Sequence, residues 1–253
     1  MFEILTPLAH AAGDLALSHF GNLASGDVES KGPLDLVTEA DRAVEALIIA
    51  RLHEAFPQDS VLGEEGGMIA GGSDRVWVID PIDGTFNFVR GGAQWAVSIG
   101  LWQDGQPVAG VVHAPVMGLT LTGGVDHAPT LNGRPLPPLS PYLPDRAAVG
   151  VSLGRAIPVA ERIAMLRFLS DEADIKFRCC NASTISLMEM AIGEVDGHVG
   201  YGESAWDVMA VWPVLMALGA VSTMDWATTP LDAKLHYVIG KPGLVEVCRS
   251  LAG

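Results

Sequence analysis

The sequence predicts a layered α/β fold, and two observations on its 253 residues support that class. Short apolar runs typical of strands alternate with segments of helical periodicity, above all in the second half of the chain. Hydrophobic residues make up 49% of the chain and charged residues 18%. That balance suits a compact core rather than a disordered chain.

The first half predicts two helices followed by a group of strands. Apolar side chains recur at helical spacing through residues 2–20, and Gly21 ends that pattern. Thr38, with Asp41 three residues later, is an N-cap signature for a second helix that ends before Pro57. A turn is expected at Asp104-Gly105. β-rich runs predict strands at 60–63, 76–80, 95–102, 108–114 and 119–122.

Five prolines crowd the stretch from Pro135 to Pro144 and predict a boundary between two lobes. We expect an N-terminal α+β lobe of residues 1–140 and a C-terminal α/β lobe of residues 141–253. Pro213 should kink the last long helix of the second lobe. The predicted elements there are strands at 147–152, 175–179 and near His198, helices at 159–169, 183–192 and 206–218, then two strands and a terminal helix.

Charge and cysteine content argue against several classes of protein. The formal net charge of −15 and the lack of a Lys/Arg run predict that nucleic acid is not a partner. No apolar run approaches the ~20 residues of a membrane span, and the N-terminus lacks the basic region of a signal peptide. The three cysteines have no metal-ligand spacing and suit a reducing compartment. A cytoplasmic protein without membrane contact is expected.

Residues 80–85, Asp-Pro-Ile-Asp-Gly-Thr, carry the clearest chemical signal. They bring two carboxylates, three residues apart, from the end of the strand at 76–80 to the start of a short helix. Carboxylates at a strand end bind hard cations such as Mg²⁺, and the N–H groups of a helix start bind an anion such as phosphate. Taken alone, however, an Asp-x-x-Asp pair in such a turn more often only ends a strand.

Other acidic segments accompany this one: Asp-Leu-Val-Thr-Glu-Ala-Asp at 35–41, Gly-Glu-Glu-Gly at 63–66 and Trp-Asp-Val-Met-Ala at 206–210. In this order around Trp-Val-Ile-Asp-Pro-Ile-Asp-Gly-Thr-Phe-Asn-Phe at 77–88, they resemble the inositol monophosphatase family of Mg²⁺-dependent, lithium-sensitive phosphatases. The resemblance covers nearly the whole chain from Lys31 onward. It implies an αβαβα sandwich of the sugar-phosphatase type and a homodimer.

The resemblance also implies a set of metal ligands. Glu64, Asp80 and the backbone carbonyl of Ile82 would bind a first metal ion. Asp80 would bridge to a second ion, held also by Asp83 and Asp207. With a weaker ion near Glu64, two or three Mg²⁺ ions are expected in the site.

The resemblance implies the remaining catalytic groups as well. Asp41 and Thr85 would orient the nucleophilic water, and with Glu64 they make up the expected catalytic residues. The N–H groups of Gly84 and Thr85 would receive the phosphate, and a missing Cβ at Gly84 lets an anion approach the backbone. Taken singly, Glu64 also reads as an exposed loop residue, and Asp41 and Asp207 as helix caps.

Two departures from the family pattern affect substrate choice. Inositol-selective members carry a Glu seven residues before the Asp of Trp-Asp, and here that position is Gly200. Glu203 lies close by in sequence and is a candidate substrate-binding residue. The helix start at 181–184 reads Asn-Ala-Ser-Thr, where Gly-Thr-Ala or Gly-Ser-Ala is usual. Ser183 there is a second candidate for substrate binding, and also an N-cap candidate. Lys31 reads either as a residue near the site or as an exposed lysine.

The predicted function is hydrolysis of a small phosphate monoester by a metal-activated water. The substrate class is a polyol or amino-alcohol phosphate similar to inositol monophosphate, and the small phosphorylated substrate is the expected partner. A histidinol phosphatase or another branch of the superfamily is one alternative. A non-catalytic, metal-binding relative that has kept the fold is the other. Lithium sensitivity is a further expectation from the resemblance.

Overall fold

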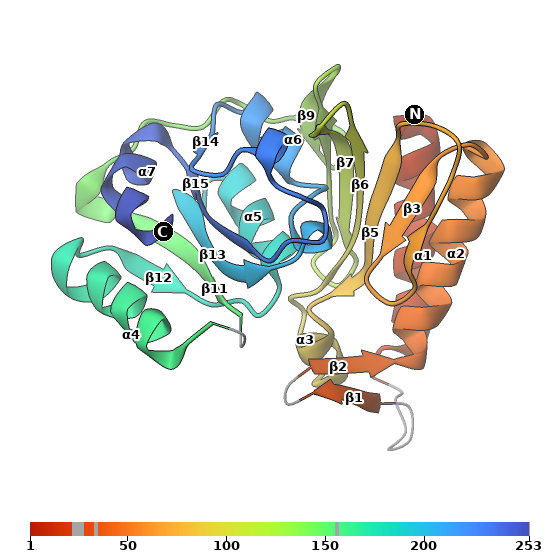
Figure 1. Ribbon diagram of the computed structural model, residues 1–253, viewed down its shortest axis with the longest axis horizontal. Coiled ribbons are helices and arrows are strands. Elements are labelled where there is room, and N and C mark those ends of the chain that lie inside the picture. Colours follow the sequence, from red (N-terminus) through yellow and green to blue (C-terminus); the bar gives the residue numbers. More distant parts are fainter. Residues whose placement is uncertain (22–27, 33–34, 155–156, 253) are drawn as a thin grey trace.

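The computed structural model describes residues 1–21, 28–32, 35–154 and 157–252, with the backbone alone at 30–32, 35–36 and 252. The chain forms five layers in the order helices, sheet, helices, sheet, helices (Figure 1). The predicted αβαβα sandwich is therefore confirmed.

The larger sheet carries two long helices, α1 (Phe2–His19) and α2 (Glu39–Ala55), on its outer face (Figure 1). Its neighbouring strands are antiparallel except for the parallel pair β3 and β5. In order across this sheet the strands are β10 (Arg134–Pro135), β9 (His127–Leu131), β8 (Leu119–Gly124), β7 (Gln106–Ala114), β6 (Ala96–Gln103), β5 (Val76–Asp83), β3 (Ser60–Gly63) and β4 (Gly67–Ile69).

The alternation of side chains along β5 explains how one sheet serves two hydrophobic cores. Trp77 and Ile79 are fully buried in the core beneath α1 and α2. Val78, between them, is buried in the core on the opposite face. Because successive strand residues point to opposite faces, an unbroken apolar run is what a strand covered on both sides requires.

The smaller sheet completes the sandwich. Helices α5 (Ser183–Ala191) and α6 (Trp212–Ala217) contribute to the core between the two sheets, whereas α4 (Val159–Arg167) and α7 (Pro242–Cys248) cover the outer face (Figure 1). A short helix, α3 (Thr85–Val89), follows β5 near the hairpin of β1 (Val28–Gly32) and β2 (Asp35–Thr38). The strands of the smaller sheet in order are β12 (Lys176–Arg178), β11 (Ala148–Leu153), β13 (Gly197–Glu203), β15 (Leu235–Gly240) and β14 (Val221–Ser222).

Most predicted elements are confirmed, and local chemistry explains their ends. Thr38 caps α2 through a reciprocal capping box with Asp41, as the spacing predicts. Asp104 and Gly105 both have positive φ, at 51° and 79°, in the tight turn between β6 and β7. The strand expected at 175–179 is shorter, at Lys176–Arg178. The division into lobes at residue 140 stays a prediction.

The helix predicted at 206–218 is wrong. A 3₁₀ turn spans Ala205–Asp207, residues 208–211 form further turns, and α6 begins only at Trp212. Pro213 lies in the first turn of α6, where a missing N–H costs nothing, so it begins the helix rather than kinking it. Periodicity alone could not separate these turns from a helix, because residues 208–215 are buried on every side.

The buried turns at 208–211 lie directly on the larger sheet. A Cβ at Gly110 would overlap the carbonyl oxygen of Ala210, and one at Gly100 would lie 2.8 Å from the Ala210 nitrogen. Glycine at these two strand positions therefore allows backbone-to-backbone approach. Among the described residues, no helix combines the length and apolar character needed to cross a membrane.

We expect Gly110→Ala to lower the free energy of unfolding by about 2–3 kcal/mol, because the added methyl group forces the 208–211 turns away from β7. Chemical denaturation would measure the loss. Gly72→Ala is the matched control, since its Cβ would meet only the movable end of the Gln58 side chain. Equal stability of the two variants would contradict the close approach.

Candidate metal and phosphate site

A β-bulge brings the two aspartates of the 80–85 segment to the same face of the sheet. The strand expected at 76–80 continues to Asp83, and Asp80 pairs with Ser98 while Asp83 pairs with Ala96. Three residues of β5 thus lie opposite two residues of β6. In a regular strand, residues three apart point to opposite faces, and the extra residue corrects this difference. Pro81 lies within the bulge, a place in a sheet where a residue without an N–H is tolerated.

Asp207 joins this pair from the second half of the chain. One carboxylate oxygen from each of Asp80, Asp83 and Asp207 lies within 4.8 Å of the others. Burial raises the pKa of Asp80 and of Asp207 well above its usual range, and the neighbouring carboxylates raise both further. Oxygen ligands that converge and repel one another fit a hard divalent cation, whose charge would remove the repulsion.

Backbone N–H groups hold each of these carboxylates in place. Ile82 N–H donates to Asp80 at 3.0 Å, and Ser204 N–H donates to Asp207 at 2.6 Å. Asp207 is therefore the last residue of the 3₁₀ turn Ala205–Asp207, and its carboxylate accepts the N–H of the N-cap residue Ser204. It does not cap the start of a long helix, which corrects the interpretation of Asp207 as a helix cap. A Ser-x-x-Asp spacing in the sequence indicates such a cap. Ser204, whose N–H holds the Asp207 carboxylate, is therefore a residue that the sequence analysis missed.

Asp83 accepts the first N–H groups of α5, which belongs to the other half of the chain. Ser183 N–H donates to Asp83 Oδ1 at 3.3 Å, and Thr184 N–H donates to Oδ2 at 2.7 Å. Ser183 and Thr184 are thus the first residues of α5 and not its N-cap, which is Ala182. A charged carboxylate from β5 takes the place of a local cap. Burial still outweighs these bonds and raises the pKa of Asp83 to about 6.

Asp41 and Thr85 lie together, as the resemblance implies. The Thr85 hydroxyl is 3.2 Å from Asp41 Oδ1 and 3.1 Å from the Ile82 carbonyl oxygen. Asp41 Oδ2 accepts hydrogen bonds from the N–H and hydroxyl of Thr38, at 2.7 and 2.6 Å. Burial raises the pKa of Asp41, partly offset by the bonds from Thr38. The helix-cap reading and a role in the site are both compatible with this geometry.

Gly84 sits where no other residue fits. Its φ of 94° is left-handed, and a Cβ there would lie 2.8 Å from the Gln94 carbonyl oxygen and 2.9 Å from Ala182 Cβ. It forms the N-cap of α3, and Thr85 is the first residue of that helix. This helix start follows Asp83 directly, and binding of phosphate to its N–H groups stays a prediction.

Glu64 stands at the edge of the acidic cluster rather than within it. It is half-buried directly after β3, and its N–H donates to the Ile79 carbonyl oxygen at 3.3 Å. Its negative charge contributes to the raised pKa of both Asp80 and Asp207. A fully exposed loop position is therefore wrong for Glu64. The Lys31 side chain lies outside the described residues.

A cavity of about 560 Å³ opens next to the carboxylates. Asp83, Ser183, Glu203 and Asp207 all line it, so both candidate substrate residues border the acidic cluster. Ser152 lines it too, with its hydroxyl 3.0 Å from that of Ser183. The sequence analysis missed Ser152, and nothing in its local pattern signals a position across the cavity.

Glu203 occupies the space that a side chain at position 200 would need. A Cβ at Gly200 would lie 2.5 Å from Glu203 Oε2. The Glu203 carboxylate is buried and hydrogen-bonded to His198 Nε2 at 3.1 Å and to the Tyr237 hydroxyl. Burial raises the pKa of Glu203, but attraction to His198 and hydrogen bonds from His198, Ser183 and Tyr237 outweigh it and lower the pKa to about 2. A carboxylate from position 203, rather than one from position 200, therefore borders this cavity.

A model of the inositol monophosphatase family matches residues 1–248. The chain belongs to the inositol monophosphatase family. Inositol-1-monophosphatase ImpA of Mycolicibacterium smegmatis is 35% identical over 234 residues, with 89% of this chain and 83% of that protein covered. A Nus factor SuhB of Pseudomonas aeruginosa is 34% identical over 252 residues, covering 95% and 91%.

The fold agrees with solved structures of the same family. The crystal structure of extragenic suppressor protein suhB from Bartonella henselae matches with a TM-score of 0.90 at 25% identity, and the match covers 99% of this chain and 97% of that one. The family is a metal-dependent phosphatase family that acts on small phosphorylated substrates, and the described residues contain an acidic cluster able to hold a metal ion.

The raised pKa of Asp83 predicts how stability without metal depends on pH. Its folded-state pKa of about 6 lies above the usual 3.8, so the native protein keeps a proton that the unfolded chain releases. The stability that the folded protein gains from this bound proton is fully present below about pH 4 and is lost as the pH rises through 6. In chelator, we expect Asp83 to account for a fall of about 2 kcal/mol in the free energy of unfolding between pH 4.5 and 7. Asp83→Asn should remove that share of the slope, and an unchanged slope in urea denaturation would contradict it.

Proposed function

We propose that this protein is a Mg²⁺-dependent phosphomonoesterase that attacks its substrate with a metal-activated water. The observation that supports it best is the convergence of Asp80, Asp83 and Asp207 within 4.8 Å, next to the Asp41–Thr85 pair. Uncatalysed hydrolysis of phosphate monoesters is extremely slow, and such a site assembles the groups that the reaction needs.

In this proposal the metal-binding residues are those that the resemblance implies. Glu64, Asp80 and the backbone carbonyl of Ile82 would hold one ion, and Asp80, Asp83 and Asp207 would hold a second. Glu64 would also support a third, weaker ion. Bound Mg²⁺ would lower the pKa of a water molecule, neutralise the phosphate oxygens and stabilise the leaving oxygen. Among the lining residues, oxygen atoms dominate the donor set, which suits Mg²⁺ rather than a softer metal.

The chain's own residues then orient the water and accept its proton. Thr85 Oγ1 accepts a hydrogen bond from the water while it donates its own proton toward Asp41 Oδ1, 3.2 Å away. Thr38 holds the other Asp41 oxygen, so the carboxylate keeps one orientation. A buried carboxylate with a raised pKa suits proton acceptance. The N–H groups of Gly84 and Thr85 bind the phosphate at the start of α3.

The cavity beside the metal site selects the substrate. Ser183 and Glu203 present a hydroxyl and a carboxylate edge, which are groups that pair with hydroxyl or amino groups. A small polyol or amino-alcohol phosphate, similar to inositol monophosphate, is the proposed substrate class. Histidinol phosphate and other substrates of the superfamily are the alternatives. A carboxylate at position 203, rather than at position 200, supports an altered choice among these compounds.

A second candidate function follows from the relative named as a Nus factor, which is 34% identical over 252 residues. A partner-binding protein that keeps the fold without needing turnover would explain such similarity. The net charge of −15 still favours the view that nucleic acid itself is not bound.

We further propose a cytoplasmic, lithium-sensitive homodimer whose subunits comprise lobes 1–140 and 141–253, as the resemblance and the proline-rich stretch suggest.

Phosphate release should depend on Mg²⁺ and stop in chelator. Inositol 1-phosphate, histidinol phosphate, fructose 1,6-bisphosphate and adenosine 3′,5′-bisphosphate form the test panel. Asp83→Asn should lower kcat/KM for the preferred compound at least 100-fold, because it removes a metal ligand. Asp225→Asn, on an exposed turn, is the control. No turnover of any compound, with Mg²⁺ still raising the melting temperature, would favour the partner-binding alternative.

Ser183→Ala should change substrate binding while leaving the metal site intact, since Ser183 holds Asp83 through its backbone N–H and not through its hydroxyl. We expect KM for the preferred substrate to rise about fivefold, in line with the loss of one hydrogen bond. The Mg²⁺ dependence should stay that of the parent protein. An unchanged KM across the panel would remove Ser183 from the substrate-binding residues.

A further inference from the structure

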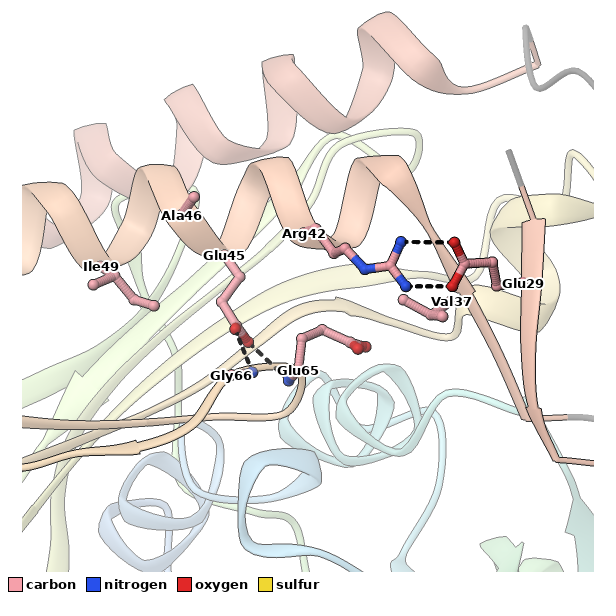
Figure 2. A pocket seen from close by; sticks show the side chains of 8 residues that line it. All are labelled: Glu29, Val37, Arg42, Glu45, Ala46, Ile49, Glu65 and Gly66. Atoms are coloured by element: carbon pink, nitrogen blue, oxygen red, sulfur yellow. Dashed lines mark hydrogen bonds and ion pairs between the residues drawn. The ribbon is translucent and has the colours of Figure 1, made fainter. Parts of the chain in front are cut away.

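A buried glutamate on α2 holds the turn that carries Glu64. Glu45 is only 4% exposed, and its carboxylate accepts two backbone hydrogen bonds from the segment between β3 and β4 (Figure 2). Glu65 N–H donates to Oε2 at 3.0 Å, and Gly66 N–H donates to Oε1 at 2.7 Å. Hydrogen bonds from N–H groups to a buried carboxylate are among the stronger ones in proteins.

Two glycines of this turn, one before Glu64 and one after it, lie against the Glu45 carboxylate. A Cβ at Gly63 would lie 2.5 Å from Glu45 Oε2, and a Cβ at Gly66 would lie 2.8 Å from Oε1. Neither glycine has a positive φ, so backbone conformation does not explain why glycine stands there. The space that both glycines leave is the space that the Glu45 carboxylate fills.

We propose that Glu45 is a positioning residue that sets the place of the Glu64 carboxylate, and thereby the affinity of the site for Mg²⁺. Glu64 N–H is fixed to Ile79 on β5, and the next two N–H groups are fixed to Glu45. The backbone of Glu64 is thus held from both directions. This inference rests on the proposed function, because it assumes that Glu64 helps to bind the metal.

The same helix ties this turn to the groups that orient the water. Asp41 lies four residues before Glu45 on α2, so the two buried carboxylates share one face of the helix. Asp41 reaches Thr85 at the start of α3, whereas Glu45 reaches the turn after β3. A rigid helix therefore sets the distance between the Asp41–Thr85 pair and Glu64. Figure 2 shows Glu45 directed at Gly66 and Glu65, one turn of α2 beyond the ion pair of Arg42 with Glu29.

The decisive variant is Glu45→Gln, which keeps the size of the side chain. Its amide oxygen can accept one of the two N–H groups, but its NH₂ group must then face the other donor. We expect the Mg²⁺ concentration that gives half of the metal-induced rise in melting temperature to increase about tenfold, the usual effect of removing support behind a ligand. Thermal denaturation at graded Mg²⁺ measures this without any substrate. Glu54→Gln, exposed on the same helix beside Arg51, is the matched control and should leave the midpoint unchanged.

Gly66→Ala tests the same contact from the other side. The added methyl group would press on Glu45 Oε1 without straining the backbone, so it should also raise the midpoint Mg²⁺ concentration. Combined with Glu45→Ala, which empties the space, the methyl group should cause little further change. Such non-additivity is what direct contact between the two positions requires.

The outcomes separate this inference from the proposed function. If Mg²⁺ does not raise the melting temperature of the parent protein, the proposed metal site itself is wrong. If Mg²⁺ stabilises the parent and Glu45→Gln or Gly66→Ala lowers the melting temperature with an unchanged Mg²⁺ midpoint, Glu45 only stabilises the turn and the inference is overturned. Should Glu45→Gln fail to fold, the Mg²⁺ midpoint of Gly66→Ala decides between these results.

Discussion

The mutual repulsion of three carboxylates in a largely buried site is the constraint on which the rest of this structure depends. Asp80, Asp83 and Asp207 lie within 4.8 Å of one another, and burial and like charge raise the pKa of each. A folded chain tolerates such a group only where other forces hold the carboxylates in place. Here the backbone does so, through N–H groups of Ile82 and Ser204 and through the first turn of α5. Without a cation, the repulsion between these carboxylates destabilises the folded state. The packing of the surrounding hydrophobic cores must offset that cost.

The site also joins the two sheets, which makes the close packing between them part of its chemistry. Asp83 at the end of β5 takes the N–H groups of α5, and Asp207 reaches the cluster because the turns after it lie against β6 and β7. Glycines at 100 and 110 permit that approach. The position of the Asp207 carboxylate thus depends on two strand glycines outside the acidic cluster.

Different elements of the fold supply the acidic cluster and the buried carboxylate of Glu203. The acidic cluster and the Asp41–Thr85 pair come from elements around the larger sheet and the turn at 205–207, whereas Glu203 comes from β13 of the smaller sheet. Glu203 folds back over Gly200 and is fixed by His198 and Tyr237, and these contacts lower the pKa of its carboxyl group beside the cavity. Under the proposed function, Glu203 bears on the choice of substrate rather than on the direct ligation of metal.

The sequence by itself determined the features that short-range chemistry controls. The capping box of Thr38 and Asp41, the turn at Asp104-Gly105 and the strand leading to Asp80 are all local, because each depends on residues within a few positions of one another. The motif order also indicated which acids would meet. Only the tertiary structure decided how they meet. The bulge that turns Asp80 and Asp83 to one face, the cap that Asp83 provides for α5 and the break of the expected helix at 206–218 all depend on partners far away in the chain. Local periodicity cannot contain that information, because the competing conformations differ mainly in contacts with distant strands and helices.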